Sequence, residues 1–224
     1  MTDLVGIQSS GDTPRIGRRA AYPVNLDVTG RSVLVVGAGR VAARKVAGLV
    51  AAGAHVTVVA PETDPTIDEL AREGRVDLER RTYMVGDAAG YRLVVTATGV
   101  PAVDAAVAAD AESQRVWVNS ADDPANCSFI LPAIVRDGPV SVAVSTSGSS
   151  PALASWLRDR IAELLGTGTA ELAGLLAEGR ARVKASGRST ESVDWRGLLD
   201  GAFPDLVRAG RIDEARELLD ETVG

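Results

Sequence analysis

The chain has 224 residues, of which 46% are hydrophobic and 4% aromatic, and it carries a formal net charge of −6 at pH 7. This length provides enough material for one large domain or two small ones with a substantial core. The acidic balance argues against a nucleic-acid-binding protein, which needs a basic face, but local arginines and backbone amides can still bind an anionic substrate.

Cysteine and histidine are too rare for most metal sites. The single cysteine, Cys127, excludes an intramolecular disulfide and a cysteine-built zinc site, and the single histidine, His55, excludes a multi-histidine site. We therefore predict no metal ligand. No stretch approaches the roughly 18 apolar residues of a membrane span, and the N-terminus lacks the apolar core of a signal peptide. These features predict a cytoplasmic protein without a membrane partner, in which residues 1–20 form a polar tail.

The first ordered segment has the pattern of a strand–helix–strand unit. Val33–Val36 is a short apolar run, as a buried parallel strand requires, and the sequence GAGRVA follows it directly. Helical spacing of apolar residues continues to Val50, Gly53 ends the helix, and 55–59 is a second β-rich run. We interpret His55, at the start of that run, as structural.

The glycine-rich turn lies where a dinucleotide site needs it, between a buried strand and a helix start. Gly37 permits a tight turn, Gly39 lets the backbone approach a pyrophosphate, and Ala42 is small enough for close packing between helix and strand. The alternative is a strand–helix turn with a structural role only.

The end of the second strand is where an acidic residue would bind the ribose of the cofactor. Glu62 follows this strand after Pro61, which favours NAD. Arg40, Arg44 and Lys45 are near enough in sequence to leave a 2′-phosphate, and hence NADP, open.

The alternation of strands and helices continues to Asn119. A helix is expected around 66–73, a strand near 75–78, a strand at 91–95, a helix at 103–111 and a strand at 115–119. This pattern predicts an α/β fold with a Rossmann-like, doubly wound parallel sheet over residues 21–120. Thr96–Gly99 ends one strand in small residues, as a loop on the nicotinamide side of a cofactor would.

The pattern changes after Asn119. Two β-like runs, Ser128–Val135 and Val140–Val144, are joined by a turn, and no helix completes a further βαβ unit. Residues 121–150 are therefore predicted to form a β dimerisation segment that a second subunit completes. Helices expected at Pro151–Leu165, Gly168–Ser186, Val193–Leu199 and Ile212–Leu219 make residues 151–224 a small all-helical domain.

Only serine, threonine and glycine lie between Val144 and Pro151. The residues are Ser145, Thr146, Ser147, Gly148, Ser149 and Ser150. Ser150 suits the N-cap of the helix that follows, Pro151 suits its first position, and a helix start presents unpaired N–H groups. The segment is either a site for an anion or a capped loop without a ligand, and its residues alone leave both interpretations open.

Four ordered stretches carry a family resemblance: YPVNLDVTGRSVLVVGAGRVAARKVAGLVAAGAHVTVVAPE, TAT, NSADDPANCSFILPAI and VAVSTSGSSPALASWLRDRI. They are similar to the precorrin-2 dehydrogenase/sirohydrochlorin ferrochelatase module of siroheme synthases. The similarity runs from about Tyr22 to Lys184 and Trp195. The long methyltransferase domain of the fused enzymes is absent, so the chain resembles the stand-alone form.

The resemblance implies oxidation of precorrin-2 to sirohydrochlorin with NAD⁺ as hydride acceptor, and it leaves open whether insertion of Fe²⁺ to give siroheme follows. It also implies a homodimer joined through the region after Asn119, and it makes residues 121–150 an active-site segment as well as a dimerisation segment. The family's key aspartate falls on Asp122, as proton acceptor or transient iron ligand. The alternative is that Asp122 or Asp123 only caps the turn before Pro124. The family's cofactor contacts fall on Gly37, Gly39, Arg40, Val41, Pro61 and Glu62, with Thr98 and Asn119 near the nicotinamide.

The resemblance also favours a substrate role for Ser145–Ser150. Precorrin-2 carries eight carboxylates, so its site needs many N–H and O–H donors and little bulk. The family's loop serine, phosphorylated in some members, aligns with Thr146. Cys127 is interpreted as a small buried hydrophobe.

The alternatives to this function are an NAD-sensing or binding module without turnover, a dehydrogenase of a small acid, and a dehydrogenase without chelatase activity. The first lacks a visible output element, and the second lacks a histidine or lysine acid–base pair.

Overall fold

The computed structural model describes residues 21–121 and 123–224, so the predicted polar tail and Asp122 lie outside the described residues. The chain divides into two compact units, residues 1–131 and 132–224. Each unit is described by itself below. The predicted four-part division, at residues 20, 120 and 150, stays a prediction.

The first unit is built on a five-stranded parallel sheet in the order β3–β2–β1–β4–β5. The strands are β1 Ser32–Val36, β2 His55–Val59, β3 Asp77–Glu79, β4 Leu93–Thr96 and β5 Trp117–Ser120. Chain order runs outward from β1 to β3 on one side and then returns to β4 and β5 on the other. The sheet therefore has a switch point between β1 and β4, as a doubly wound fold does. The predicted fold class is confirmed.

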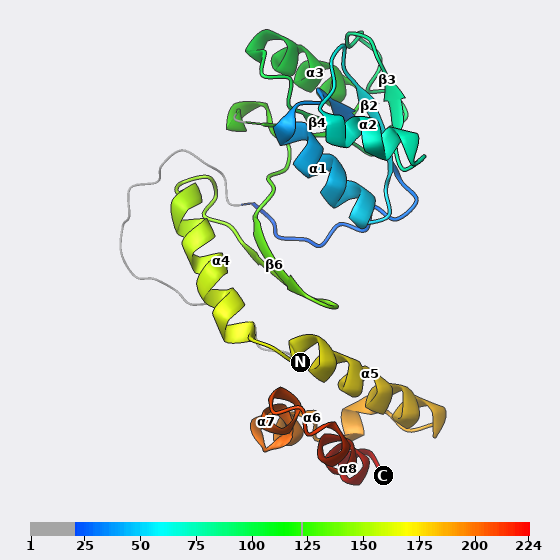
Figure 1. Ribbon diagram of the computed structural model, residues 1–224, viewed down its shortest axis with the longest axis vertical. Coiled ribbons are helices and arrows are strands. Elements are labelled where there is room, and N and C mark those ends of the chain that lie inside the picture. The colour runs from blue at the N-terminus through cyan, green and yellow to red at the C-terminus, as the bar shows by residue number, and fades with distance from the viewer. Residues whose placement is uncertain (1–20, 122) are drawn as a thin grey trace. The chain divides into compact units, whose positions relative to one another are not determined.

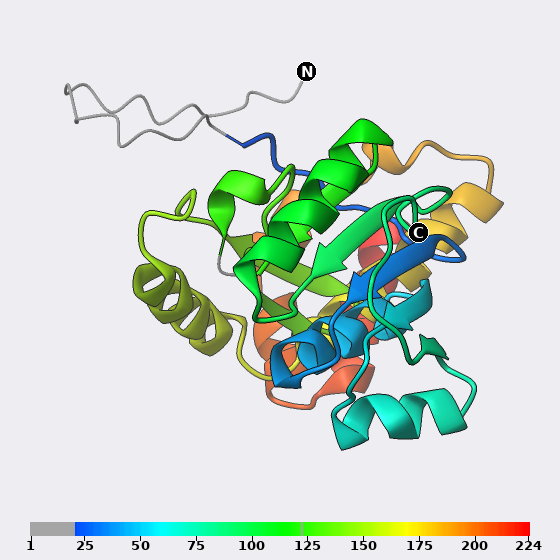
Figure 2. The same ribbon diagram turned by 90° about the horizontal axis from the view of Figure 1, so that it is seen from above.

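Helices cover both faces of this sheet (Figures 1 and 2). α1 (Arg40–Ala51) and α2 (Pro65–Arg72) pack on one face, while α3 (Pro101–Ser113) packs on the other. Alternate residues of β1 divide between the two cores, with Val33 and Val35 on the α1 face and Leu34 and Val36 on the α3 face. Burial on both faces explains why the strands read as continuous apolar runs.

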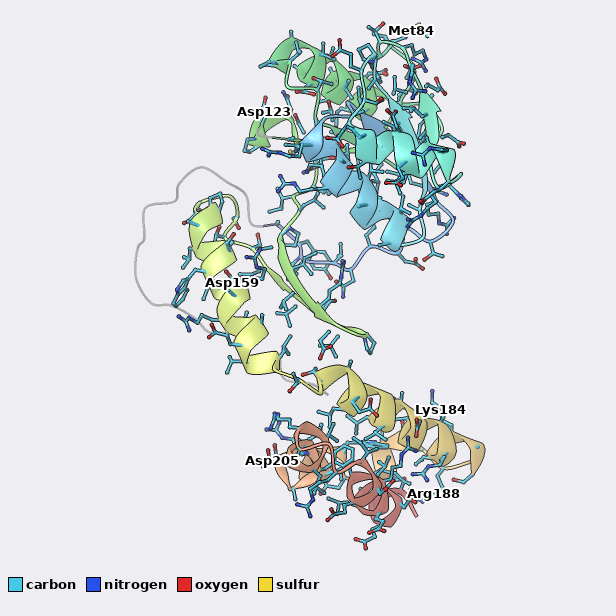
Figure 3. The ribbon with its side chains drawn as sticks, viewed as in Figure 1. Met84, Asp123, Asp159, Lys184, Arg188 and Asp205 are labelled. Atoms are coloured by element: carbon cyan, nitrogen blue, oxygen red, sulfur yellow. The ribbon has the colours of Figure 1, made fainter. Side chains whose placement is uncertain are left out.

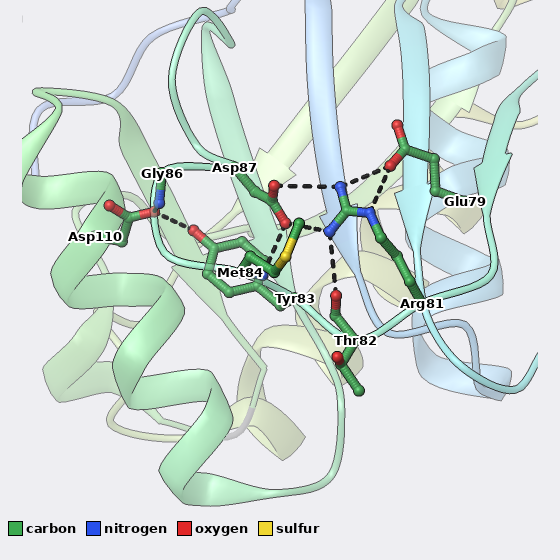
Figure 4. A network of polar contacts seen from close by, with 8 residues as sticks. All are labelled: Glu79, Arg81, Thr82, Tyr83, Met84, Gly86, Asp87 and Asp110. Atoms are coloured by element: carbon green, nitrogen blue, oxygen red, sulfur yellow. Dashed lines mark hydrogen bonds and ion pairs between the residues drawn. The ribbon is translucent and has the colours of Figure 1, made fainter.

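The long connection from β3 to β4 is held against the α3 face by a polar network (Figure 4). The Arg81 guanidinium pairs with the carboxylate of Asp87 at 2.5 Å. The Tyr83 hydroxyl donates to Asp110 of α3, and the Gly86 N–H donates to the same carboxylate at 2.8 Å. Burial raises the pKa of Asp110, but these hydrogen bonds outweigh it and hold that pKa below its ordinary value.

The second unit begins with an antiparallel hairpin of β6 (Ala133–Asp137) and β7 (Val140–Val144), against which α4 (Pro151–Leu165) packs. Four further helices share a separate core: α5 Thr169–Ala185, α6 Trp195–Asp200, α7 Phe203–Arg208 and α8 Ile212–Val223. Phe203 is fully buried in that core beside Leu175 and Leu219. None of the described helices has the length and the apolar run that crossing a membrane requires.

Two sequence-based expectations differ from the structure. The run predicted as a strand from Ser128 becomes a strand only at Ala133, because Ser128 bonds to Val118 and Phe129 packs into the core of the first unit. Two short 3-10 turns, Pro124–Asn126 and Thr190–Ser192, and α7 were not predicted. Helices this short carry too little periodic signal to be recognised.

Candidate functional site

The turn between β1 and α1 lies at the carboxyl edge of the sheet, at the switch point. Gly37 adopts a positive φ of +98°, and a Cβ added there would lie 2.5 Å from the carbonyl oxygen of Ala97, which follows β4. The Gly37 N–H donates to the carbonyl of Val59, at the end of β2, at 2.9 Å. Only glycine fits this position, because the turn is held between the ends of both neighbouring strands.

The start of α1 is open to an anion. Its N-cap is Gly39, which has no capping side chain, and the first turn holds no acidic residue. Every other described α-helix has either a side-chain cap or an acidic residue in its first turn. Nothing lies within 4 Å of a Cβ added to Gly39, and both Arg40 and Val41 are exposed. Free N–H groups and partial positive charge at such a helix start fit a pyrophosphate.

The loop after β2 lies beside this turn. The Asp64 N–H donates to the Ala38 carbonyl at 2.8 Å, which joins the loop to the glycine turn. Asp64 caps α2, and the hydrogen bond from the Thr66 N–H lowers the pKa of its carboxyl. Pro61 and Glu62 are exposed, and the Glu62 carboxylate has no hydrogen-bond or ion-pair partner among the described residues. Glu62 is therefore available for a hydroxyl of the adenosine ribose.

The loop after β4 is fixed by a buried carboxylate that the sequence did not reveal. Asp104 of α3 accepts from the Thr96 hydroxyl, from the Thr98 N–H at 3.1 Å and from the Thr98 hydroxyl at 2.9 Å. These bonds hold the loop segment that includes the Ala97 carbonyl packed against Gly37. Thr98 lies at the predicted edge of the site with its hydroxyl already bonded, and its contact with the nicotinamide stays a prediction.

Asn119, at the end of β5, is buried and bonded through both atoms of its amide. Its Oδ1 accepts from Lys45 Nζ at 2.9 Å, and its Nδ2 donates to the Phe129 carbonyl at 3.0 Å. The amide oxygen keeps a second lone pair, and a contact of Asn119 with the cofactor stays a prediction. Because β5 and β2 lie on opposite sides of β1, Lys45 reaches away from the ribose end. Arg40 and Arg44 remain as candidates for binding a 2′-phosphate.

The two neighbouring aspartates after β5 differ in what the structure reveals. Asp123, labelled in Figure 3, caps the 3-10 turn. It accepts from the Ala125 N–H at 3.0 Å and from Asn126 Nδ2 at 2.8 Å. Asp123 therefore serves as the turn cap before Pro124. Asp122 lies outside the described residues, and its catalytic role stays a prediction.

The serine-rich loop belongs to the second unit and bonds largely to itself. Ser150 caps α4 by accepting from the Leu153 N–H at 3.2 Å. The Thr146 hydroxyl donates to the Ser150 carbonyl at 3.0 Å and accepts from the Ser150 N–H at 3.1 Å. Ser147, at a φ of +52°, and Gly148, at +78°, form the tight turn. Ser145 and Ser149 are exposed, so the loop offers fewer hydroxyls to a ligand than its sequence suggests.

Two family models match consecutive parts of the chain. One, described as "Putative NAD(P)-binding", matches residues 24–133, and the other, described as "Sirohaem biosynthesis protein central", matches residues 137–164. The first unit is thus an NAD(P)-binding domain, in agreement with its fold and its open helix start.

Similar proteins include siroheme synthases. The one from Nitrosospira multiformis is 40% identical over 89% of this chain and 45% of its own length, and the one from Methylococcus capsulatus is 39% identical over 88% and 42%. The chain therefore spans less than half the length of these relatives. The solved structure of SirC, precorrin-2 dehydrogenase, matches with a TM-score of 0.73 and 28% identity, over 90% of this chain and 98% of that one.

Proposed function

This chain belongs to the family of the siroheme synthases and precorrin-2 dehydrogenases, and from that premise we propose that it oxidises precorrin-2 to sirohydrochlorin with NAD⁺. The observation that carries the proposal is the open start of α1 at the switch point of an NAD(P)-binding fold. This is the place where doubly wound sheets bind dinucleotides.

The residues at this edge suit NAD more than NADP. The N–H groups at the start of α1 would hold the pyrophosphate, with Gly37, Gly39, Arg40 and Val41 around it. Pro61 and Glu62 would meet the adenosine ribose, where the Glu62 carboxylate accepts from a 2′-hydroxyl and repels a 2′-phosphate. When bound, NAD⁺ supplies the hydride acceptor. The catalytic efficiency with NAD⁺ relative to NADP⁺ tests this choice.

Oxidation of precorrin-2 releases a proton as well as a hydride, so the chain must supply a proton acceptor. Asp122 follows the carboxyl end of β5 and is the candidate, because the carboxylate of its neighbour Asp123 is occupied as a turn cap. The same carboxylate would suit acceptance of pyrrole protons if Fe²⁺, as a second substrate, were inserted into sirohydrochlorin to give siroheme.

The tetrapyrrole would meet the serine-rich loop, Ser145–Ser150. We place the substrate carboxylates on the hydroxyls of Ser145 and Ser149, which are exposed, and on backbone N–H groups of the loop. Ser145 Oγ accepts from the Ser147 N–H at 3.2 Å but keeps its own O–H as a donor, whereas the Thr146 hydroxyl donates within the loop. Like-charged side chains in this loop would then weaken substrate binding.

We further propose a cytoplasmic homodimer joined through residues from Asn119 to about Leu165. The β6–β7 hairpin has only two strands, so each has an unpaired edge within the second unit. Large apolar side chains nearby are exposed, among them Ile134, Leu153 and Trp156. A second subunit would cover these edges and side chains. Light scattering at micromolar concentration tests the dimer, because it should give twice the mass of the monomer, and a clean monomer mass would contradict it.

One assay decides between turnover and binding alone. Purified protein is mixed with NAD⁺ and enzymatically made precorrin-2, and absorbance is followed for NADH and for sirohydrochlorin. We expect both to rise in equal amounts. Binding of NAD⁺ without either product would mean a binding module and would overturn the proposal; adding Fe²⁺ afterwards tests for siroheme formation.

A further inference from the structure

Lys45 makes a contact that the cofactor site does not explain. It lies on α1, but its ammonium group reaches β5 and donates to Asn119 Oδ1 at 2.9 Å. Asn119 is buried, so its amide must find partners within the protein. A charged donor makes this a stronger hydrogen bond than one between neutral groups.

Asn119 also bonds to the segment that follows β5, so its position affects that segment. Its Nδ2 donates to the Phe129 carbonyl at 3.0 Å and lies 3.7 Å from Cys127 Sγ. Lys45, Asn119 and Phe129 therefore hold both sides of the loop of residues 120–127, in which the structure describes every residue but Asp122, with α1 as the anchor.

Cys127 closes the loop from within. Its sulfur accepts from the Ser120 N–H at 3.2 Å and lies 3.3 Å from the carbonyl oxygens of both Ser120 and Asp123, one of which takes the thiol hydrogen. The thiol thus joins the first residues of the loop to its last residue. Cys127 is half-buried rather than buried as the sequence suggested, and its thiol is bonded on several sides instead of packing only as a small hydrophobe.

We propose that Lys45 is a positioning residue for the reaction: through Asn119 and Cys127 it holds the loop of residues 120–127, on which Asp122 lies, in the arrangement that turnover requires. The proposal rests on the proposed function, because Asp122 is the candidate proton acceptor. Within the proposal, Lys45 acts by holding this loop through Asn119.

The single cysteine of the chain lets the loop be tested without precorrin-2. Lys45→Met removes the donor but keeps a long side chain, so Asn119 loses its anchor and the loop opens more often. We expect the rate of Cys127 alkylation by iodoacetamide, measured by mass spectrometry, to rise at least about fivefold, because local opening exposes the thiol. Lys184→Met is the matched control, since Lys184 is exposed on α5 of the other unit (Figure 3).

Turnover provides the second measurement. Displacing a catalytic group by about 1 Å lowers kcat by up to about 100-fold, so we expect a loss of about 10–100-fold in kcat for Lys45→Met, with an NAD⁺ Kd within about threefold of wild type. Lys45→Arg, which restores a charged donor, should recover most of both effects. Lys45→Gln replaces Lys45→Met if the latter does not fold.

The outcomes are distinguishable. An unchanged alkylation rate overturns the proposal whatever happens to kcat. If kcat falls while the alkylation rate stays the same, Lys45 acts directly on the reaction and not through the loop. A faster alkylation rate in a protein whose wild type does not oxidise precorrin-2 overturns the proposed function but supports the role of Lys45 in holding the loop. A faster alkylation rate with an unchanged kcat shows that the loop is held but that turnover does not need it, which also overturns the proposal.

Discussion

The two helix starts that the sequence marked as anion sites, those of α1 and α4, are built in opposite ways. The start of α1 has a glycine N-cap, no capping side chain and no acidic residue in its first turn, so no side chain competes with an anion for its N–H groups. The start of α4 is capped by Ser150, and the loop before it is closed by Thr146. At an exposed, uncapped helix start the N–H groups bond to water that an anion can replace, whereas at a capped one a side chain already occupies part of them. We therefore assign the cofactor phosphates to α1 and a weaker, hydroxyl-mediated contact to the loop before α4.

The largest effect should come from Asp122, the proposed proton acceptor, rather than from either helix start. Asp122→Ala should lower turnover by about two to four orders of magnitude, the usual contribution of a general base. The NAD⁺ affinity and the melting temperature should change little, since Asp123 caps the turn. Asp123→Asn, which keeps one capping oxygen, is the control. Wild-type rates of both oxidation and iron insertion in Asp122→Ala would remove the catalytic assignment.

The loop before α4 should show a smaller effect, confined to the substrate. Ser149→Asp places a carboxylate near those of the tetrapyrrole, and two such charges 4 Å apart in water repel by about 1 kcal/mol, or about fivefold in KM for precorrin-2. The KM for NAD⁺ should not change, because the cofactor phosphates are proposed to bind a different loop, the glycine turn before α1. Ser149→Ala, the matched neutral variant, should stay close to wild type. Equal KM values for all three proteins would mean that the loop is only a helix cap.

The smallest effect concerns the stability of the connection between β3 and β4, which contains neither helix start. Asp110 has a lowered pKa because hydrogen bonds from Tyr83 and the backbone outweigh its burial (Figure 4). A group whose pKa is lower in the folded state stabilises the fold above its unfolded pKa of about 3.9, and this stabilisation is lost as the pH falls through the folded value.

Tyr83→Phe removes one donor and should lower the free energy of unfolding at pH 7 by about 0.5–1.5 kcal/mol. The difference from wild type should shrink as the pH falls below the unfolded pKa of about 3.9, and it should vanish below the lowered folded pKa, where Asp110 is protonated in both states. Urea unfolding across this pH range measures it, with NAD⁺ affinity as the unaffected control. A constant difference at every pH would show that Asp110 is not the partner that matters.

The sheet and the glycine turn were predictable because their signals are local. Val33–Val36 is apolar and continuous, and the turn residues follow at fixed spacing. The contact of Lys45 with Asn119 joins positions 74 residues apart, and no pattern in the sequence marks it. Likewise, two adjacent aspartates are equivalent in sequence, and only the hydrogen bonds of Asp123 show which one caps the turn.

Other features of the site depend on hydrogen bonds within the chain that the sequence alone does not indicate. The serine-rich loop was recognised, but its division into bonded and exposed hydroxyls follows from the φ values of Ser147 and Gly148, which fold Thr146 back onto Ser150. Asp104 looked like an ordinary helix residue, although it is buried and binds the loop after β4. The sequence signal that could have revealed this contact is an aspartate in the first turn of a helix, directly after a loop with two threonines.

A matched pair of aspartates tests the central claim, that the start of α1 holds the cofactor. Gly39→Asp and Ser150→Asp each place an aspartate at an N-cap, and both should fold, since aspartate is a favoured N-cap and the Gly39 φ of −77° suits any residue. In Gly39→Asp the carboxylate meets the pyrophosphate, so calorimetry should give an NAD⁺ Kd at least about 100-fold higher, whereas Ser150→Asp should bind like wild type. An NAD⁺ Kd for Gly39→Asp within threefold of wild type would contradict the account.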